Sequence, residues 1–176
     1  METIKSRFQS ILAEESQEFQ QNLEAKVAYI LQKRHLTVAS AESITAGLIA
    51  YRLTTQPGSS SFYSGGVTCY SARAKVHQLG ILPKTIAVKG EVSAEVATAM
   101  AEEIRRRLDT DLGLSATGFA GPAVSDTEKV GLVFIGLATR ERSAVHQFLF
   151  DGDRDSIRRQ TADAALGLLY FEVEGS

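Results

Sequence analysis

The sequence predicts an α/β fold in a single domain. Short apolar segments typical of strands alternate with longer segments whose apolar residues recur at helical spacing. The chain has 176 residues, of which 44% are hydrophobic and 23% charged, values that suit one globular domain with a sizeable core. We expect residues 15–176 to form this domain and residues 1–14 to be an N-terminal arm.

The chain is predicted to begin with a helix, a strand and a second helix. Apolar residues at helical spacing predict the first helix over residues 15–35, residues 37–41 form the first strand, and the second helix contains residues 48–53. Ser43 and Thr45 bring hydroxyls to the start of the second helix, where backbone N–H groups and the helix dipole favour an anion such as phosphate. The alternative is that they are a helix cap and a threonine facing the helix.

The stretch at residues 57–75 concentrates hydroxyls, paired glycines, a tyrosine and a lysine between two apolar segments, a composition typical of a site. Pro57 and Gly58 begin a turn, residues 66–70 resemble a short buried strand, and Ser71 caps the next helix. The paired glycines Gly65 and Gly66, where this strand begins, indicate that another backbone or a substrate comes close.

Three side chains of this stretch have the chemistry of a hydrolytic site. Tyr70 ends the predicted strand and Lys75 lies in the first turns of the helix, so both can reach one cleft at the carboxyl edge of the sheet, where α/β sheets bind ligands. A lysine kept neutral by burial can take the proton of a serine, which makes Ser60 and Lys75 a candidate dyad with Tyr70 as proton relay or oxyanion donor. The alternative is a loop serine, a core aromatic and a solvated lysine.

The second half of the chain is predicted to contain two strong helices and three strands. Residues 81–92 are expected to be an irregular link, after which Ser93 caps a helix that ends in three arginines, as the dipole favours. The final helix follows residues 151–154. The expected strands are residues 111–116, 130–139 and 144–150, the last two as an antiparallel pair.

Two features of this half lie where ligand contacts are expected. Gly118 and Gly121 belong to a loop directly after a strand, where backbone N–H groups can hold an oxyanion or a ribose, with an ordinary turn as the alternative. Arg154, at the first turn of the last helix, is either a salt-bridging surface residue or a bidentate phosphate donor that reaches over the cleft.

Composition and spacing exclude several classes of protein. The net charge of −2 disfavours nucleic-acid binding, and the three histidines share no metal-ligand spacing, so neither a metal nor another cofactor is expected. No uncharged apolar run is long enough to span a bilayer, so no membrane partner is expected. The single cysteine, Cys69, is expected in the core and fits a reducing cytoplasm.

Six motifs, in order, closely resemble the CinA C-terminal domain family, over residues 24–171. The resemblance implies a three-layer α/β/α domain with a mixed five-stranded sheet, here with an extra N-terminal helix. It also implies the activity of the family's nicotinamide-nucleotide amidases, which hydrolyse the carboxamide of nicotinamide mononucleotide to nicotinate mononucleotide and ammonia. The motifs are A-E-S-I-T-A-G at 41–47, P-G-S-S at 57–60, G-G-V-T-C-Y-S-A-R-A-K at 65–75, G-E-V-S at 90–93, T-G-F-A-G-P at 117–122 and G-D-R at 152–154.

The resemblance places the amidase residues on Ser43, Ser60, Tyr70 and Lys75, with Arg154 as a contact to the substrate phosphate. The preferred mechanism has Ser60 attack the carboxamide, Lys75 act as general base and Tyr70 assist proton transfer. Ser43 then orients the network or the substrate, and Ser43 as the nucleophile is the alternative. We expect a nucleotide substrate and a homo-oligomer, with a dimer as the expected assembly.

The chain departs from the family pattern close to these side chains. Ile44 and Ala46 stand where the family usually has cysteine and glycine, and Ala72 and Arg73 replace an Asn-Glu pair. After Pro122, where several glycines are usual, the chain reads Ala123-Val124-Ser125. The alternative function is therefore a weakened or inactive nucleotide-binding or regulatory protein on the same fold.

Overall fold

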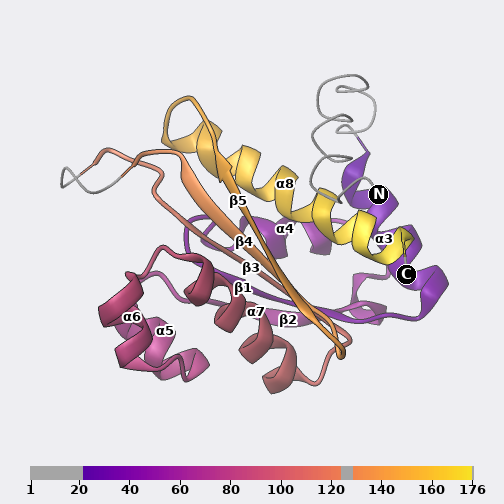
Figure 1. Ribbon diagram of the computed structural model, residues 1–176. Helices are drawn as coiled ribbons and strands as arrows, with labels where there is room; N and C mark the ends of the chain where they lie inside the picture. Colours follow the sequence, from indigo (N-terminus) through magenta and orange to yellow (C-terminus); the bar gives the residue numbers. More distant parts are fainter. Residues whose placement is uncertain (1–21, 124–128, 176) are drawn as a thin grey trace.

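A mixed five-stranded sheet forms the centre of the protein (Figure 1). The structure is a computed structural model that describes residues 22–123 and 129–175. The strands are β1 (Val38–Glu42), β2 (Tyr63–Thr68), β3 (Leu112–Gly118), β4 (Leu132–Ala138) and β5 (Ser143–Leu149). Their order is β2-β1-β3-β4-β5; β1 is parallel to β2 and β3, whereas β4 is antiparallel to β3 and β5.

Helices cover both faces of the sheet and give three layers (Figure 1). Each face buries an apolar cluster, the larger one under α3, α4 and α8 and the smaller one under α5 and α7. The predicted three-layer α/β/α domain with a helix before the first strand is confirmed. One layer holds α3 (Leu23–Arg34), α4 (Leu48–Thr54) and α8 (Arg154–Glu174), and the other holds α5 (Ala72–Leu79), α6 (Pro83–Lys89) and α7 (Ala94–Leu108).

Both serines predicted to cap helices do so. The Ser71 hydroxyl accepts a hydrogen bond from the backbone N–H of Ala74 at 3.1 Å, and the Ser93 hydroxyl accepts one from Val96 at 3.3 Å. An oxygen at this position satisfies an N–H group that the first helical turn leaves without a partner. These caps fix the starts of α5 and α7, which carry or border the pocket described below.

Two segments differ from their predictions. β2 begins earlier than expected and lies at the edge of the sheet, so alternate residues stay exposed and the strand is not fully buried. The expected irregular link at residues 81–92 contains α6, because Pro83 supplies a φ angle suited to the first turn and Gly90, at φ 79°, ends the helix. The helix predicted over residues 15–35 corresponds to α3, which begins at Leu23 after Asn22 and ends at Arg34. The arm predicted at residues 1–14 and the predicted helix start at residue 15 lie outside the described residues.

The paired glycines of β2 include a position of close backbone approach. A Cβ atom on Gly66 would lie 2.7 Å from the backbone oxygen of Ser40 in β1 and would collide with the Ser40 and Tyr63 hydroxyls. Those two hydroxyls are hydrogen-bonded at 2.8 Å. The predicted close approach is therefore confirmed at Gly66, and the group that comes close is the backbone of the neighbouring strand β1.

Candidate functional site

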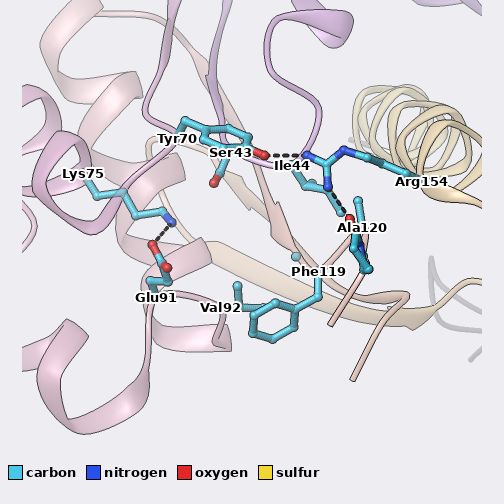
Figure 2. Close-up of a pocket in the computed structure, with 12 residues that line it drawn as sticks. Ser43, Ile44, Tyr70, Lys75, Glu91, Val92, Phe119, Ala120 and Arg154 are labelled. Atoms are coloured by element: carbon cyan, nitrogen blue, oxygen red, sulfur yellow. Dashed lines mark hydrogen bonds and ion pairs between the residues drawn. The ribbon is translucent and has the colours of Figure 1, made fainter. Parts of the chain in front are cut away.

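A pocket of about 170 Å³ opens where the parallel strands β1, β2 and β3 end (Figure 2). Parallel strands bring the segments that follow them to one edge of the sheet, which is the usual ligand edge of an α/β domain. The pocket is lined by Ser43 and Ile44 after β1, Tyr70 and Lys75 after β2, Glu91 and Val92 before α7, residues 118–122 at the end of β3 and directly after it, and Arg154 at the start of α8.

Lys75 is buried in this pocket although it carries an amine. Its side chain is 1% exposed, and its Nζ lies 3.3 Å from Oε2 of Glu91, whose side chain is 45% exposed. A buried ammonium is costly unless a counter-charge or a hydrogen-bond acceptor lies next to it. Sequence reasoning gave Glu91 no role; the only signal was its place in the G-E-V-S motif directly before the α7 cap.

Ser43 is the serine that the fold brings into the pocket. It follows the last residue of β1, is 7% exposed, and its backbone N–H donates to the carbonyl oxygen of Ala116 in β3 at 2.9 Å. This bond fixes its backbone between two parallel strands. The Ser43 hydroxyl and the Lys75 amine both point into the cavity (Figure 2).

Tyr70 and Arg154 meet at the open side of the pocket. Arg154 Nη2 donates to the Tyr70 hydroxyl oxygen at 2.6 Å, and Nη1 donates to the carbonyl oxygen of Gly121 (Figure 2). The guanidinium therefore bridges the segments that follow β2 and β3. Arg154 thus reaches over the cleft, and its predicted role as a phosphate donor stays a prediction.

The glycine loop after β3 lines the pocket, but part of its polar backbone is already engaged. The N–H of Phe119 donates to the carbonyl oxygen of Leu132 at 3.0 Å. Gly118 was predicted in this loop but is the last residue of β3, and a Cβ atom on it would lie 2.8 Å from that same carbonyl oxygen, so a side chain there would collide with β4. Gly121 has φ 82°, a left-handed conformation that glycine adopts without strain, and its carbonyl faces Arg154.

Ser60 lies at the opposite end of β2 from the pocket. It is an exposed residue of the short 3₁₀ turn η1 (Ser59–Ser61), which precedes β2, whereas Tyr70 and Lys75 follow that strand. The six residues of β2 span about 20 Å at about 3.3 Å per residue. The predicted contact between Ser60 and Lys75 is therefore not formed within this chain, because a strand separates the two residues in space.

Thr45 is not brought to the pocket either. It is fully buried, and among the described residues its hydroxyl has no hydrogen-bond partner. Arg158 of α8 donates to the carbonyl oxygens of Ile44 and Thr45 at 3.2 and 3.1 Å, which holds this turn against α8. Ala46 follows at φ 50°, in the left-handed region that favours glycine, so the departure from the family's usual glycine places an alanine in a strained position.

The start of α4, expected to hold an anion, already holds a carboxylate of the chain. Glu42 is 1% exposed and accepts hydrogen bonds from the backbone N–H groups of Gly47 at 2.9 Å, Ile49 at 3.1 Å and Ala50 at 2.8 Å. The carboxylate satisfies the free donors and complements the helix dipole. The phosphate site expected at this helix start is therefore filled by Glu42.

Replacing Glu42 with alanine is expected to lower the free energy of unfolding by about 3 kcal/mol, because three N–H groups at the start of α4, one buried and two half-buried, lose a charged acceptor. Urea unfolding followed by circular dichroism measures this change. Glu42→Gln keeps one acceptor oxygen and should lie between the wild type and Glu42→Ala. An unchanged midpoint for Glu42→Ala would show that the cap contributes nothing to stability.

Cys69 is a core residue in the structure. It is 0% exposed, directly after β2, and burial raises the pKa of its thiol to about 11, although the charge of Lys75 opposes this shift.

We expect iodoacetamide at pH 8 to label Cys69 in the folded protein far more slowly than in protein unfolded in guanidinium chloride, since the thiolate is the reactive form. Intact mass reports one adduct, because the chain has one cysteine. Equal labelling rates in the two states would contradict the buried placement.

Residues 22–123 and 129–175 contain neither a metal-binding cluster nor a helix that could span a membrane. In these two ranges no group of three or more histidine, cysteine, aspartate or glutamate side chains is arranged to hold a metal ion. No helix in this described part of the chain combines the length and the hydrophobicity needed to cross a membrane.

The fold and the pocket define a three-layer α/β/α domain with a buried lysine and a serine at the carboxyl edge of its parallel strands. The model of the CinA C-terminal domain family matches residues 20–173. The chain therefore belongs to the CinA C-terminal domain family, as the sequence motifs indicate.

Relatives and solved structures agree with this assignment. The chain is 47% identical over 149 residues to a protein of Moorella thermoacetica named as competence-damage inducible, covering 84% of this chain and 36% of that protein. It is 44% identical to a CinA-like protein of Geotalea daltonii, covering 87% and 37%. The chain thus spans little more than a third of the length of these curated relatives.

The crystal structures of two relatives have the same fold. The competence/damage inducible protein CihA from Agrobacterium tumefaciens has a TM-score of 0.83 and 32% sequence identity, covering 88% of this chain and 95% of that chain. The competence damage-inducible protein A (ComA) from Klebsiella pneumoniae has a TM-score of 0.85 and 28% identity, covering 88% and 97%.

Proposed function

We propose that the chain is an amidohydrolase that converts nicotinamide mononucleotide to nicotinate mononucleotide and ammonia. The observation that carries the proposal is that Ser43, Tyr70 and Lys75 line one pocket with Arg154 at its open side. These residues supply a nucleophile, a hydroxyl donor, a base and a cation that suits a phosphate. The geometry favours Ser43 over Ser60 as the nucleophile, which was the alternative left open by the sequence.

In this mechanism the Ser43 oxygen attacks the carboxamide carbon while Lys75, in its uncharged form, takes the serine proton. Tyr70 donates a hydrogen bond to the oxyanion. The tetrahedral intermediate then expels ammonia, which leaves with the proton held by Lys75. Water, deprotonated by Lys75, hydrolyses the acyl ester and the proton returns to Ser43, so the enzyme ends as it began.

The rest of the pocket suits a pyridine nucleotide. Ile44, Val92 and Phe119 provide apolar contacts for a flat ring (Figure 2). Two nitrogens of Arg154 donate hydrogen bonds to the Tyr70 hydroxyl and the Gly121 carbonyl oxygen. A substrate phosphate can replace these two acceptors and form a charge-assisted bidentate contact with the guanidinium. A substrate phosphate at the mouth would leave the carboxamide free to enter toward Ser43.

The proposal is tested by incubating the purified protein with nicotinamide mononucleotide and measuring ammonia in a coupled assay and nicotinate mononucleotide by chromatography. Equal amounts of both products are expected. Nicotinamide riboside, which lacks the phosphate, should have a much higher KM, and Arg154→Ala should remove most of this preference. Absence of both products under conditions in which the nucleotide binds would contradict the proposal.

One observation favours the second candidate, a nucleotide-binding protein without turnover. Lys75 lies within ion-pair distance of Glu91, an arrangement that suits an ammonium which binds an anionic ligand. Calorimetry that detects tight binding of nicotinamide mononucleotide, together with no ammonia after hours of incubation, would favour this candidate over the amidase.

A further inference from the structure

Glu91 links the buried amine of the pocket to the solvent. Its Oε2 lies 3.3 Å from Nζ of Lys75, and the Glu91 side chain is 45% exposed while that of Lys75 is 1% exposed. The carboxylate thus lies at the pocket wall and contacts water on one side and Lys75 on the other (Figure 2). An opposite charge at this distance favours the ammonium form of a lysine over the free amine.

The loop that carries Glu91 is held by bonds that do not use the carboxylate. The Thr117 hydroxyl donates to the backbone oxygen of Glu91 at 3.0 Å, and the Ser93 hydroxyl donates to the backbone oxygen of Gly90 at 3.1 Å. The positive φ angle of Gly90 turns the chain out of α6 directly before Glu91. The loop therefore has its own anchors, and the side chain of Glu91 is available for a role at Lys75.

The other ionisable groups around Lys75 differ from Glu91. Cys69 is a buried thiol whose pKa is raised by burial to about 11, and the Glu42 carboxylate is engaged by three N–H groups of α4. Tyr70 and Arg154 at the mouth bond to each other. On α5 itself, Arg73 and His77 are exposed.

We propose that Glu91 is a positioning residue that acts through Lys75: its carboxylate orients the Lys75 amine in the pocket and sets the pH at which that amine becomes free to accept a proton from Ser43. The inference rests on the proposed function, in which Lys75 is the base. On the acid side of the profile of kcat/KM against pH, the rate should therefore rise as Lys75 loses its ammonium proton. Glu91 holds this rise, the acid limb, at higher pH.

The test compares the pH profile of kcat/KM for the wild type, Glu91→Gln and Glu91→Asp. Glutamine keeps the size of the side chain and removes its charge, so the acid limb should move to lower pH. Aspartate restores the charge and should return the limb toward its wild-type position. Glu95→Gln is the matched control, because Glu95 pairs with Lys89 at 2.7 Å on the surface, outside the pocket, and should leave the limb unchanged. If Glu91→Gln lowers the rate by the same factor at every pH, the carboxylate is only structural and the inference is wrong.

A second measurement does not depend on turnover. Acetic anhydride acylates uncharged amines, so the labelling of Lys75 can be followed against pH by peptide mass spectrometry, with exposed Lys84 as internal reference. The onset of Lys75 labelling should move to lower pH in Glu91→Gln by about the same shift as the acid limb, and remain in place in Glu95→Gln. If this onset does not move, the proposed link from Glu91 to Lys75 is overturned, whether or not the protein releases ammonia. If it moves while the wild type releases none, the link stands and the amidase proposal fails.

Discussion

Ser43→Ala is expected to lower turnover of nicotinamide mononucleotide by at least roughly 10³-fold, because no other side chain would form the acyl intermediate. Ser60→Ala, at the far end of β2, should keep turnover within about twofold of the wild type, as expected for an exposed residue away from the site. The two variants remove the same hydroxyl from two positions of one chain. Their comparison therefore shows whether the nucleophile is Ser43, which the fold places beside Lys75 in the pocket, or Ser60, which the sequence spacing suggested.

Both serine variants should unfold at the same temperature as the wild type, which circular dichroism can verify. The opposite result, in which Ser60→Ala loses turnover and Ser43→Ala retains it, would contradict the assignment within one chain. It would mean that Ser60 reaches a pocket of another copy, since β2 separates it from Lys75 in its own chain.

Lys75→Met should lower kcat by about 10²- to 10⁴-fold, the range that a positioned general base contributes. The fold should tolerate the change, because methionine has a similar shape and its removal of the Lys75 charge leaves no uncompensated charge in the interior. Glu91, left without its partner, remains accessible to water through its exposed half. Loss of activity without loss of stability is therefore the expected signature of Lys75.

Lys84→Met is the matched control, since Lys84 is an exposed residue of α6 on the same face of the sheet. Kinetics with nicotinamide mononucleotide and thermal unfolding should both be unchanged in this variant. Full turnover by Lys75→Met would exclude Lys75 as the base.

Much of the fold could be predicted from local patterns. Ser71 and Ser93 precede apolar stripes at helical spacing, and a serine there satisfies N–H groups in any fold, so both caps were correct. Exposure at a sheet edge depends on which strands pair, so the sequence did not reveal that β2 is an edge strand. The helix α6 buries no residue, so no apolar stripe marked it.

The site could be predicted only where chain order and spatial order agree. Tyr70 and Lys75 both follow β2 and reached one pocket as expected. Ser60 is close to them in sequence, but it precedes β2 whereas they follow it, so the length of this strand separates Ser60 from the pocket. The tertiary fold brings Glu91 to Lys75, and the turn before α4 brings the N–H groups of that helix to Glu42. The spacing of these residues in the sequence predicts neither contact.

The most direct measurement is to map the acyl group on the protein during turnover. Protein quenched in acid while it converts nicotinamide mononucleotide is digested and analysed by mass spectrometry, with Ser43→Ala treated in the same way. We predict the mass of the nicotinate nucleotide, joined as an ester, on the peptide at Ser43 and its absence from Ser43→Ala. An acyl group on Ser60, or the same adduct in Ser43→Ala, would contradict the account.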